Sequence, residues 1–373
     1  MNNDTPKTDT PLAQEMKAVI TANGPISVEL YMALCLGHPR HGYYMTRDPL
    51  GLAGDFITAP EISQMFGELL GLWAADTWRH MGEPARVRLV ELGPGRGTLM
   101  KDALRAARVL PAFHAAIDVH MVEMSPVLRR LQAETLADSG FSPAWHDAFA
   151  QVPAGPAIII ANEFFDCLPV RQYVRGREGW FERLVGLDAA GELTFGLANA
   201  PEPALTRAAP EGVLMEFPAS HLIAMRQITE RLVAQGGALL VLDYGHLSTG
   251  YGDTMQAVRD HGYTALLAEP GEADVTVHVD FAALAQAARM AGAAVHGPAT
   301  QGEFLLRLGI RERAAMLQAH AAASTGGSAA HIDTALNRLI DMDTRGMGQL
   351  FKAMAVAHPA LPLLPGFDRR HDP

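Results

Sequence analysis

Cysteine is nearly absent from this chain. Cys35 and Cys167 are the only two among 373 residues, and the motif Cys-x-x-Cys does not occur. This scarcity argues against a disulfide framework and a cysteine-ligated zinc site, and it suits a reducing compartment. The fifteen histidines are scattered, and His38 and His41, which come closest to a ligand pair, are better explained by polar roles in a loop. We therefore expect no bound metal.

Clusters of basic residues are also missing. The chain has 30 Lys and Arg against 41 Asp and Glu, which gives a net charge of −11. Proteins that bind nucleic acid neutralise phosphates with clustered cations. This composition therefore disfavours a nucleic-acid partner, including an RNA or DNA substrate.

Long apolar runs and recognisable targeting segments are lacking too. No apolar run approaches the roughly 20 residues of a membrane span. The first ten residues, MNNDTPKTDT, have neither the apolar stretch of a secretory signal nor the Arg-rich character of a mitochondrial presequence. We expect no membrane insertion and, in a bacterium, a cytoplasmic location.

What the chain does contain is enough apolar material for a large core. Apolar residues make up 49% of the sequence and charged residues 19%, so global disorder is not expected. The length suits one large α/β domain with additions, or two domains.

The most informative segment is residues 90–97, which read Val-Glu-Leu-Gly-Pro-Gly-Arg-Gly. An apolar run precedes it and helical spacing follows, so it predicts a strand, a glycine turn and a helix, as in the first half of a doubly wound nucleotide-binding fold. Glycines at 93, 95 and 97 let the backbone pass close beneath a ligand. The amino terminus of the helix offers unpaired N–H groups to that ligand.

Two ligand classes bind at such turns. A dinucleotide fingerprint requires Gly-x-Gly-x-x-Gly, but the third glycine here comes one position early and Thr98 stands in its place. Glu91 precedes the loop, and its carboxylate disfavours a pyrophosphate and favours a ligand with an ammonium and a sulfonium. The pattern resembles the first motif of class I S-adenosylmethionine (SAM) methyltransferases. A glycine turn in some other α/β enzyme is the alternative.

Strands and helices alternate from residue 86 onward. This rhythm predicts a mostly parallel α/β sheet with helices on both faces. The expected strands are 87–91, 116–123, a short one ending near Trp145, 157–161, 237–243 and, late in the chain, 351–357.

Segments that do not follow this alternation predict two additions to the main domain, an N-terminal extension and an insertion. Residues 1–85 predict a helical extension that covers the cofactor site as a lid, with two short helices in 11–36, a loop over 38–55, and a long amphipathic helix opened by a capping box at Thr58-Ala-Pro-Glu61. Residues 86–365 form the main domain. Within it, residues 170–218 carry strand-like segments and an Ala/Pro-rich stretch, and we interpret them as an insertion.

Acidic and amide side chains follow several of the expected strands: Glu91, Glu123, Asp147, Asn162-Glu163 and Asp243. In an open parallel sheet the ligand lies outside the carboxyl ends of the strands, so these groups are expected to share one site. Glu123 is placed to accept both ribose hydroxyls of SAM, and Asp147 to accept from the adenine amino group. The candidate cofactor-binding residues are Glu91, Gly93, Pro94, Gly95, Gly97, Thr98, Glu123, Asp147 and Asn162.

Taken together, these segments resemble the MidA-type methyltransferases, whose mitochondrial members are assembly factors of respiratory complex I. The matching segments are residues 54–63, 90–98, 161–170 (Ala-Asn-Glu-Phe-Phe-Asp-Cys-Leu-Pro-Val), 242–246 and 273–281. The resemblance runs from about residue 12 to 357. It implies a class I methyltransferase (Rossmann-like) fold, SAM as cofactor, and methyl transfer to an arginine of the complex I 49-kDa-type subunit. The eukaryotic relatives belong in the mitochondrial matrix.

An arginine acceptor requires carboxylates close to the transferred methyl. A guanidinium is a weak nucleophile because its charge is delocalised and its pKa exceeds about 12. Carboxylates that hold it and later accept a proton would activate it. Glu163 and Asp166 are the first candidates, while Asp55 and Glu61 flank the expected lid. Helix capping is an equal explanation for Glu61, and a role in turns is the alternative for Asp55 and Asp166.

Other functions remain open at this level. The protein could be a SAM-binding assembly factor that grips a partner with little catalysis, a small-molecule methyltransferase, or a dehydrogenase with a nucleotide cofactor. Calorimetry with SAM against NAD separates the last of these from the others.

We predict that Gly95→Val abolishes SAM binding and leaves the fold largely intact, because a branched side chain would occupy the path of the ligand. Calorimetric titration with SAM, with circular dichroism as the control for folding, measures this. An unchanged SAM affinity would reject the placement of the ligand on the glycine turn.

Overall fold

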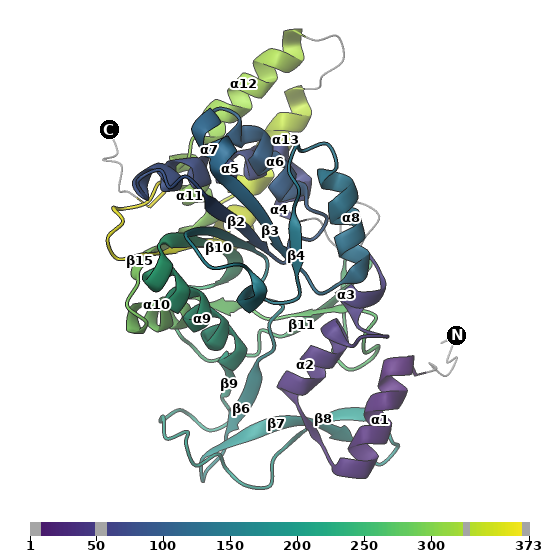
Figure 1. The fold of residues 1–373 in the computed structure, drawn as a ribbon. Coiled ribbons are helices and arrows are strands. Elements are labelled where there is room, and N and C mark those ends of the chain that lie inside the picture. The colour runs from purple at the N-terminus through teal and green to yellow at the C-terminus, as the bar shows by residue number, and fades with distance from the viewer. Residues whose placement is uncertain (1–8, 49–57, 324–328, 368–373) are drawn as a thin grey trace.

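Five parallel strands lie at the centre of the fold, and two strands with antiparallel pairing extend their sheet on one side. The computed structural model describes residues 9–48, 58–323 and 329–367 (Figure 1). The parallel strands are β2 (Val87–Leu92), β3 (Ile117–Val122), β4 (Ala144–His146), β5 (Ala157–Asn162) and β10 (Gly237–His246). With β15 (Ala294–Thr300) and β16 (Phe351–Ala357), the sheet order is β15-β16-β10-β5-β2-β3-β4, and β14 (Val279–Asp280) pairs with the end of β10. The predicted mostly parallel sheet is confirmed, and β16 runs antiparallel to both of its neighbours.

Both faces of this sheet are covered by helices. Every residue of β5 is buried, and its side chains alternate between two apolar clusters. Ile158 and Ile160 pack into the cluster that contains α5 (Gln64–His80) and α6 (Thr98–Ala107), whereas Ile159 faces α9 (Ala219–Gln235) and α10 (Phe281–Met290). A strand buried on both sides needs an unbroken apolar run, which explains the sequence Ala-Ile-Ile-Ile-Ala.

The remaining helices surround this framework. In the described residues α7 (Pro111–Ala116) and α8 (Pro126–Leu136) follow α6, and α11 (Gln301–Arg307), α12 (Ile310–Ala323), α13 (Ala329–Ile340) and α14 (Met347–Leu350) precede β16. A 3-10 turn, Phe149–Gln151, lies between β4 and β5. Within the described ranges, no helix combines the length and the apolarity that a membrane crossing requires.

The N-terminal extension is packed into the main core through α5. A Cβ atom on Gly71 would lie 2.6 Å from the Cα of Ala103, so glycine is required where α5 crosses α6. Trp73 and Trp78 of α5 are buried in the cluster on that face of the sheet, as the amphipathic pattern predicted.

Two smaller sheets lie beside the extension (Figure 1). The first has the order β1-β7-β6-β9, with β8 paired to β7, and its strands are β1 (Ile26–Ser27), β6 (Arg171–Arg175), β7 (Trp180–Leu187), β8 (Leu193–Leu197) and β9 (Leu214–Phe217). The second has the order β12-β11-β13, formed by β11 (Gln256–Arg259), β12 (Gly262–Thr264) and β13 (Asp274–Thr276). Helices α1 (Pro11–Asn23) and α2 (Val28–Gly37) share an apolar cluster with residues of both sheets. The segment 170–218 therefore pairs with the N-terminal extension through β1 and β7.

Two local predictions for the extension were wrong. Residues 49–55 of the loop expected over 38–55 lie outside the described residues, and the part that is described contains a short helix, α3 (Tyr43–Thr46). The capping box expected at Thr58 does not form. Thr58 makes no side-chain cap to the short α4 (Ala59–Ile62), and Ser63, which is extended at φ −162°, separates α4 from α5 and caps the latter through Met65 N–H at 3.2 Å. Glu61 is engaged elsewhere, by Thr98.

The strand order reverses beside β2, and this reversal positions the site. From β2 the chain proceeds to β3 and β4 on one side, and then returns to place β5 on the other. Helices cross on opposite faces at such a switch point, and a crevice opens outside the carboxyl ends of the two strands. The ends of β2 and β5 carry Glu91 and Asn162, respectively.

Candidate functional site

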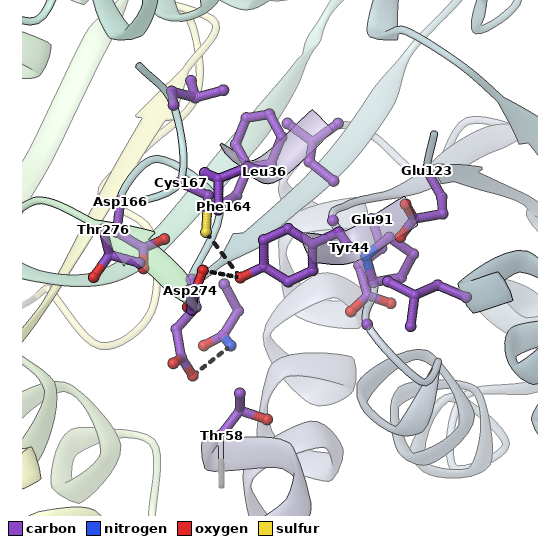
Figure 2. A pocket seen from close by; sticks show the side chains of 18 of the residues that line it. Leu36, Tyr44, Thr58, Glu91, Glu123, Phe164, Asp166, Cys167, Asp274 and Thr276 are labelled. Carbon is purple, nitrogen blue, oxygen red and sulfur yellow. Dashed lines mark hydrogen bonds between the residues drawn. The ribbon is translucent and has the colours of Figure 1, made fainter. Parts of the chain in front are cut away.

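A cavity of about 930 Å³ lies at the carboxyl edge of the sheet, within the usual size range of small-molecule sites. Most of the candidate residues line it: Glu61, Glu91, Gly93, Pro94, Gly95, Thr98, Glu123, Asp147, Asn162, Glu163 and Asp166. Gly97 is not among its lining residues, and Asp55 lies outside the described residues. Figure 2 shows the ring of Tyr44 between Glu91 and Glu123 on one side and Asp166 and Asp274 on the other.

The glycine loop joins the end of β2 to the start of α6, as its sequence predicts. Gly93, Gly95 and Gly97 have φ values of 61°, 53° and 80°, a region that favours glycine. Gly97 is the residue before α6, and the Gly95 carbonyl accepts a hydrogen bond from Gln132 Nε2 at 2.8 Å. A Cβ atom on Gly93 would lie 3.2 Å from Phe164. The loop therefore needs glycine for its own conformation, so Gly95→Val would strain the loop locally in addition to filling the space beside it.

Glu91 is a buried carboxyl group whose hydrogen bonds do not fully offset the cost of its burial. It is 3% exposed, and its Oε2 has no hydrogen-bond partner among the residues that the structure describes. Burial raises the pKa of Glu91 well above its usual value, although a hydrogen bond from the main chain of Met100 opposes the rise, and the charge of Glu123 adds to it. A cationic ligand in the cavity would relieve this cost. The group thus fits the ammonium and sulfonium of SAM.

Glu123 lies just beyond β3 and is held in place by its neighbours. Its carboxylate accepts from Ser125 N–H at 2.8 Å and from Gln132 Nε2 at 3.1 Å. Burial raises the pKa of Glu123, and these donors oppose the rise. Asp147 lines the same region at the rim, where it is 67% exposed and pairs with Arg129 at 2.5 Å.

The turn after β5 is shaped by Asp243, which the sequence had suggested as part of the ligand edge. Asp243 is fully buried and does not line the cavity. Its Oδ2 accepts from the successive N–H groups of Phe164, Phe165 and Asp166 at 3.0–3.3 Å, and its Oδ1 accepts from Tyr244 N–H at 3.0 Å. The expectation that Asp243 faces the ligand was therefore wrong, because both oxygens of its carboxylate accept hydrogen bonds from main-chain N–H groups.

Glu163 and Asp166 are brought together by that turn. Glu163 has a φ of 50°, which is uncommon outside glycine and costs about 1 kcal/mol. Burial raises the pKa of Glu163 to about 8, with the charge of Asp166 adding to the rise, and burial raises the pKa of Asp166 to about 6. Within the described part of the chain, Asp166 Oδ1 and Asn162 Oδ1 have no hydrogen-bond partner.

Glu61 faces the glycine loop from the N-terminal extension. Its carboxylate accepts from Thr98 Oγ1 at 2.5 Å and lies 3.8 Å from Arg96. Arg96 also donates to both carboxylate oxygens of Asp48, to Oδ1 at 3.2 Å and to Oδ2 at 2.9 and 2.6 Å. The extension is therefore tied to the loop by charged groups. No sequence pattern pointed to Asp48, because its partner Arg96 is 48 residues away.

A second group of polar residues in the cavity was missed from the sequence. Tyr44, Tyr244, Asp274, Thr276 and His278 also line it. In Figure 2, Asp274 and Thr276 lie on the other side of Tyr44 from Glu91 and Glu123. Asp274 and Thr276 belong to the segment 273–281, which is one of those that resemble the family. This resemblance is the sequence signal that could have identified them as site residues. The sequence could not indicate that β13 would reach the cavity.

The raised pKa values predict a distinct pH dependence of stability. A carboxyl group whose folded pKa is above its unfolded value binds a proton that the unfolded chain releases, so stability is lost as pH rises from about 4.5 through the folded pKa. Without ligand, the wild type should lose stability between pH 5.5 and 8. Glu163→Gln should lose less, by about 1–3 kcal/mol, because its titrating group is gone.

Urea unfolding across this pH range measures the effect. Glu178→Gln, which removes a carboxylate exposed in the turn between β6 and β7, is the matched control and should keep the wild-type dependence. If Glu163→Gln follows the same pH profile as wild type, Glu163 is not the proton-binding group.

Comparison with known proteins agrees with this geometry. Residues 69–299 match a family model described as S-adenosyl-L-methionine-dependent methyltransferase. The Drosophila melanogaster mitochondrial protein arginine methyltransferase NDUFAF7 homolog is 40% identical over 346 residues, which cover 83% of this chain and 77% of that protein. Human mitochondrial protein arginine methyltransferase NDUFAF7 is 37% identical over 334 residues, with 83% and 75% covered.

A solved structure extends the likeness to almost the whole chain. A Burkholderia thailandensis protein, described as a methyl transferase and bound to S-adenosyl-homocysteine, superposes with a TM-score of 0.84. It is 27% identical and covers 97% of this chain and 98% of its own. The resemblance found in the sequence is thus confirmed: the chain belongs to the SAM-dependent methyltransferase family that includes NDUFAF7, and it has the class I fold.

Proposed function

We propose that this protein transfers a methyl group from SAM to an arginine side chain of a protein substrate. The observation that carries the proposal is the set of buried, incompletely paired carboxyl groups, Glu91 and Asp166 among them, that share one cavity with the glycine loop. Both the donor, with its sulfonium, and an arginine acceptor are cationic. The names of the relatives, at 37–40% identity, support arginine as the acceptor.

The cofactor would be held by the glycine-loop side of the cavity. Gly93, Pro94, Gly95 and Thr98 would contact it from below, and Glu123 would accept from its ribose hydroxyls. When bound there, SAM supplies a methyl group on a positively charged sulfur. Glu91 and Asn162 offer buried oxygens without partners among the described residues to its cationic portion, and Asp147 lies at the rim for the adenine. Gly97 supports this loop from outside the cavity as the cap of α6.

The acceptor would meet the carboxyl groups that follow β5. Glu163 and Asp166 line the cavity, and a guanidinium bound there would favour their ionised forms. Held against them, its positive charge is drawn toward the nitrogens that face the carboxylates, so that another nitrogen is free to attack. One carboxylate then takes the proton that the methylated nitrogen loses. With pKa values near 6 and 8, these groups can do so at neutral pH.

The finer assignments rest on the family resemblance. We propose a 49-kDa-type subunit of complex I as the substrate, methylated during assembly, and a cytoplasmic location for this chain, while its relatives are named mitochondrial. We also propose that residues 1–85 act as a lid over the SAM site, with Glu61 and Asp55 on it, and that 86–365 is the catalytic domain. The hydrogen bond from Thr98, at the start of α6, to Glu61 of the extension supports the lid role.

A second candidate, from a different functional class, is a SAM-binding assembly factor that grips its partner without efficient catalysis. The small sheet of β1 and β6–β9 offers surface for such a partner, including the exposed side chains of Leu197 and Phe217. The two functions differ in whether label is transferred, and the following experiment separates them.

We predict that the protein transfers radiolabelled methyl groups from SAM to an arginine of the complex I 49-kDa-type subunit. Glu163→Gln should slow the transfer by about 10²–10⁴-fold, because it removes a proton acceptor, while SAM affinity changes by less than about threefold. Label is located by mass spectrometry. Glu134→Gln, which removes an exposed carboxylate on α8, is the control and should keep full activity. Label on another residue type would contradict arginine as acceptor, and stable binding of the subunit without transfer would favour the assembly factor.

A further inference from the structure

A second acidic wall faces the turn after β5, and it comes from a part of the chain far from the methyltransferase motifs. Asp274, the first residue of β13, lines the cavity and is 5% exposed. The backbone joins the two walls, because Val277 N–H donates to the carbonyl of Asp166 at 3.1 Å. The β13 segment is therefore held in a fixed position beside Asp166.

Tyr44 from the N-terminal extension fixes the carboxylate of Asp274. Its hydroxyl donates to Asp274 Oδ1 at 2.9 Å and lies 3.3 Å from Cys167 Sγ, as Figure 2 shows. Burial, with the charge of Asp274, raises the pKa of Tyr44 well above its usual value, so the hydroxyl stays protonated and can donate. A tyrosine of α3 thereby sets the direction of a carboxylate on β13.

An independent observation points to a ligand between these walls. Asp166 is 3% exposed, and its Oδ1 makes no hydrogen bond to the residues described here. Burial raises the pKa of Asp166, and hydrogen bonds from Tyr244 and Cys167 to its carboxyl group only partly oppose the rise. A buried carboxylate oxygen without a donor costs free energy that a bound cation with N–H groups would recover. Neither Glu163 nor the glycine loop is needed to draw this conclusion.

We propose that Asp166 and Asp274 together form the recognition site for the guanidinium group of the acceptor, with Tyr44 as the residue that positions Asp274. The proposal rests on the proposed function, since it names how the same cavity selects its second substrate. A guanidinium is planar and presents five N–H donors in fixed directions, so it can donate to carboxylates on two neighbouring walls at once. An ammonium group has three donors at one point and matches two walls less well.

This assignment gives the N-terminal extension a part in substrate selection. The groups proposed to hold the methyl donor come from the ends of β2, β3, β4 and β5 and the loops that follow them, whereas Asp274 belongs to β13 and Tyr44 to α3. Acceptor affinity and donor affinity should therefore be separable by mutation.

The test uses the full-length protein saturated with S-adenosylhomocysteine and N-acetyl-arginine amide as the probe, titrated by calorimetry. Wild type should bind the probe, and Asp274→Asn and Asp166→Asn should each weaken it by at least about tenfold, the loss of one charge-assisted interaction. Tyr44→Phe removes only a hydroxyl and should weaken the probe by about threefold. N-acetyl-lysine amide should bind more weakly than the arginine probe to wild type.

Two controls make the result specific. Affinity for S-adenosylhomocysteine should stay within about twofold of wild type in all these variants. Asp260→Asn makes the same change of charge on the turn between β11 and β12, where the side chain is 88% exposed, and should bind the probe normally.

The proposal is overturned if natively folded Asp274→Asn binds the arginine probe as tightly as wild type, or if wild type shows no saturable binding. Failure of methyl transfer to a complex I subunit, with the probe results as expected, would refute the proposed substrate and leave the guanidinium site standing. The two failures are therefore distinguishable.

Discussion

The burial of carboxyl groups without a matching cation is the constraint on which the rest of this structure depends. Glu91 and Asp166 are nearly inaccessible to solvent, and each keeps an oxygen without a donor in the described structure. Such groups cost free energy as anions, so the protein either binds protons or binds a cation there. The apolar core that covers both faces of β5 supplies the stability that makes this arrangement possible. The site is therefore prepared for positively charged ligands before any ligand arrives.

Three distant parts of the chain build the site together, and each is fixed by polar contacts. Asp243 accepts from three consecutive N–H groups and so sets the turn that carries Asp166. Arg96 of the glycine loop pairs with Asp48 of the extension. Tyr44 of that extension holds Asp274. Two of these contacts join the N-terminal extension to residues around the cavity: Asp48 to Arg96 and Tyr44 to Asp274. The extension therefore helps to build the site.

The sequence predicted the parts of the molecule that local pattern determines. The glycine segment 93–97 predicted a turn between a strand and a helix, and the apolar run 157–161 predicted a buried parallel strand; both are confirmed. It could not predict contacts made across the chain. By spacing, Glu61 was explained equally well as a helix cap and as a residue of the lid, and in the structure its carboxylate accepts a hydrogen bond from Thr98. Asp243 looked like one more polar residue at the end of a strand, yet its carboxylate accepts hydrogen bonds from the main-chain N–H groups of the neighbouring turn. Asp274 was overlooked because its role depends on Tyr44, 230 residues earlier.

The central claim is that the cavity holds protonated carboxyl groups that a cationic donor ionises. The direct measurement is the number of protons released on binding, from calorimetry at pH 7.5 in buffers with different ionisation enthalpies. SAM and S-adenosylhomocysteine differ in the sulfonium charge and one methyl group. We predict that SAM releases more protons than S-adenosylhomocysteine, because its extra positive charge lowers the pKa of Glu91. Equal proton release by the two ligands would contradict this account.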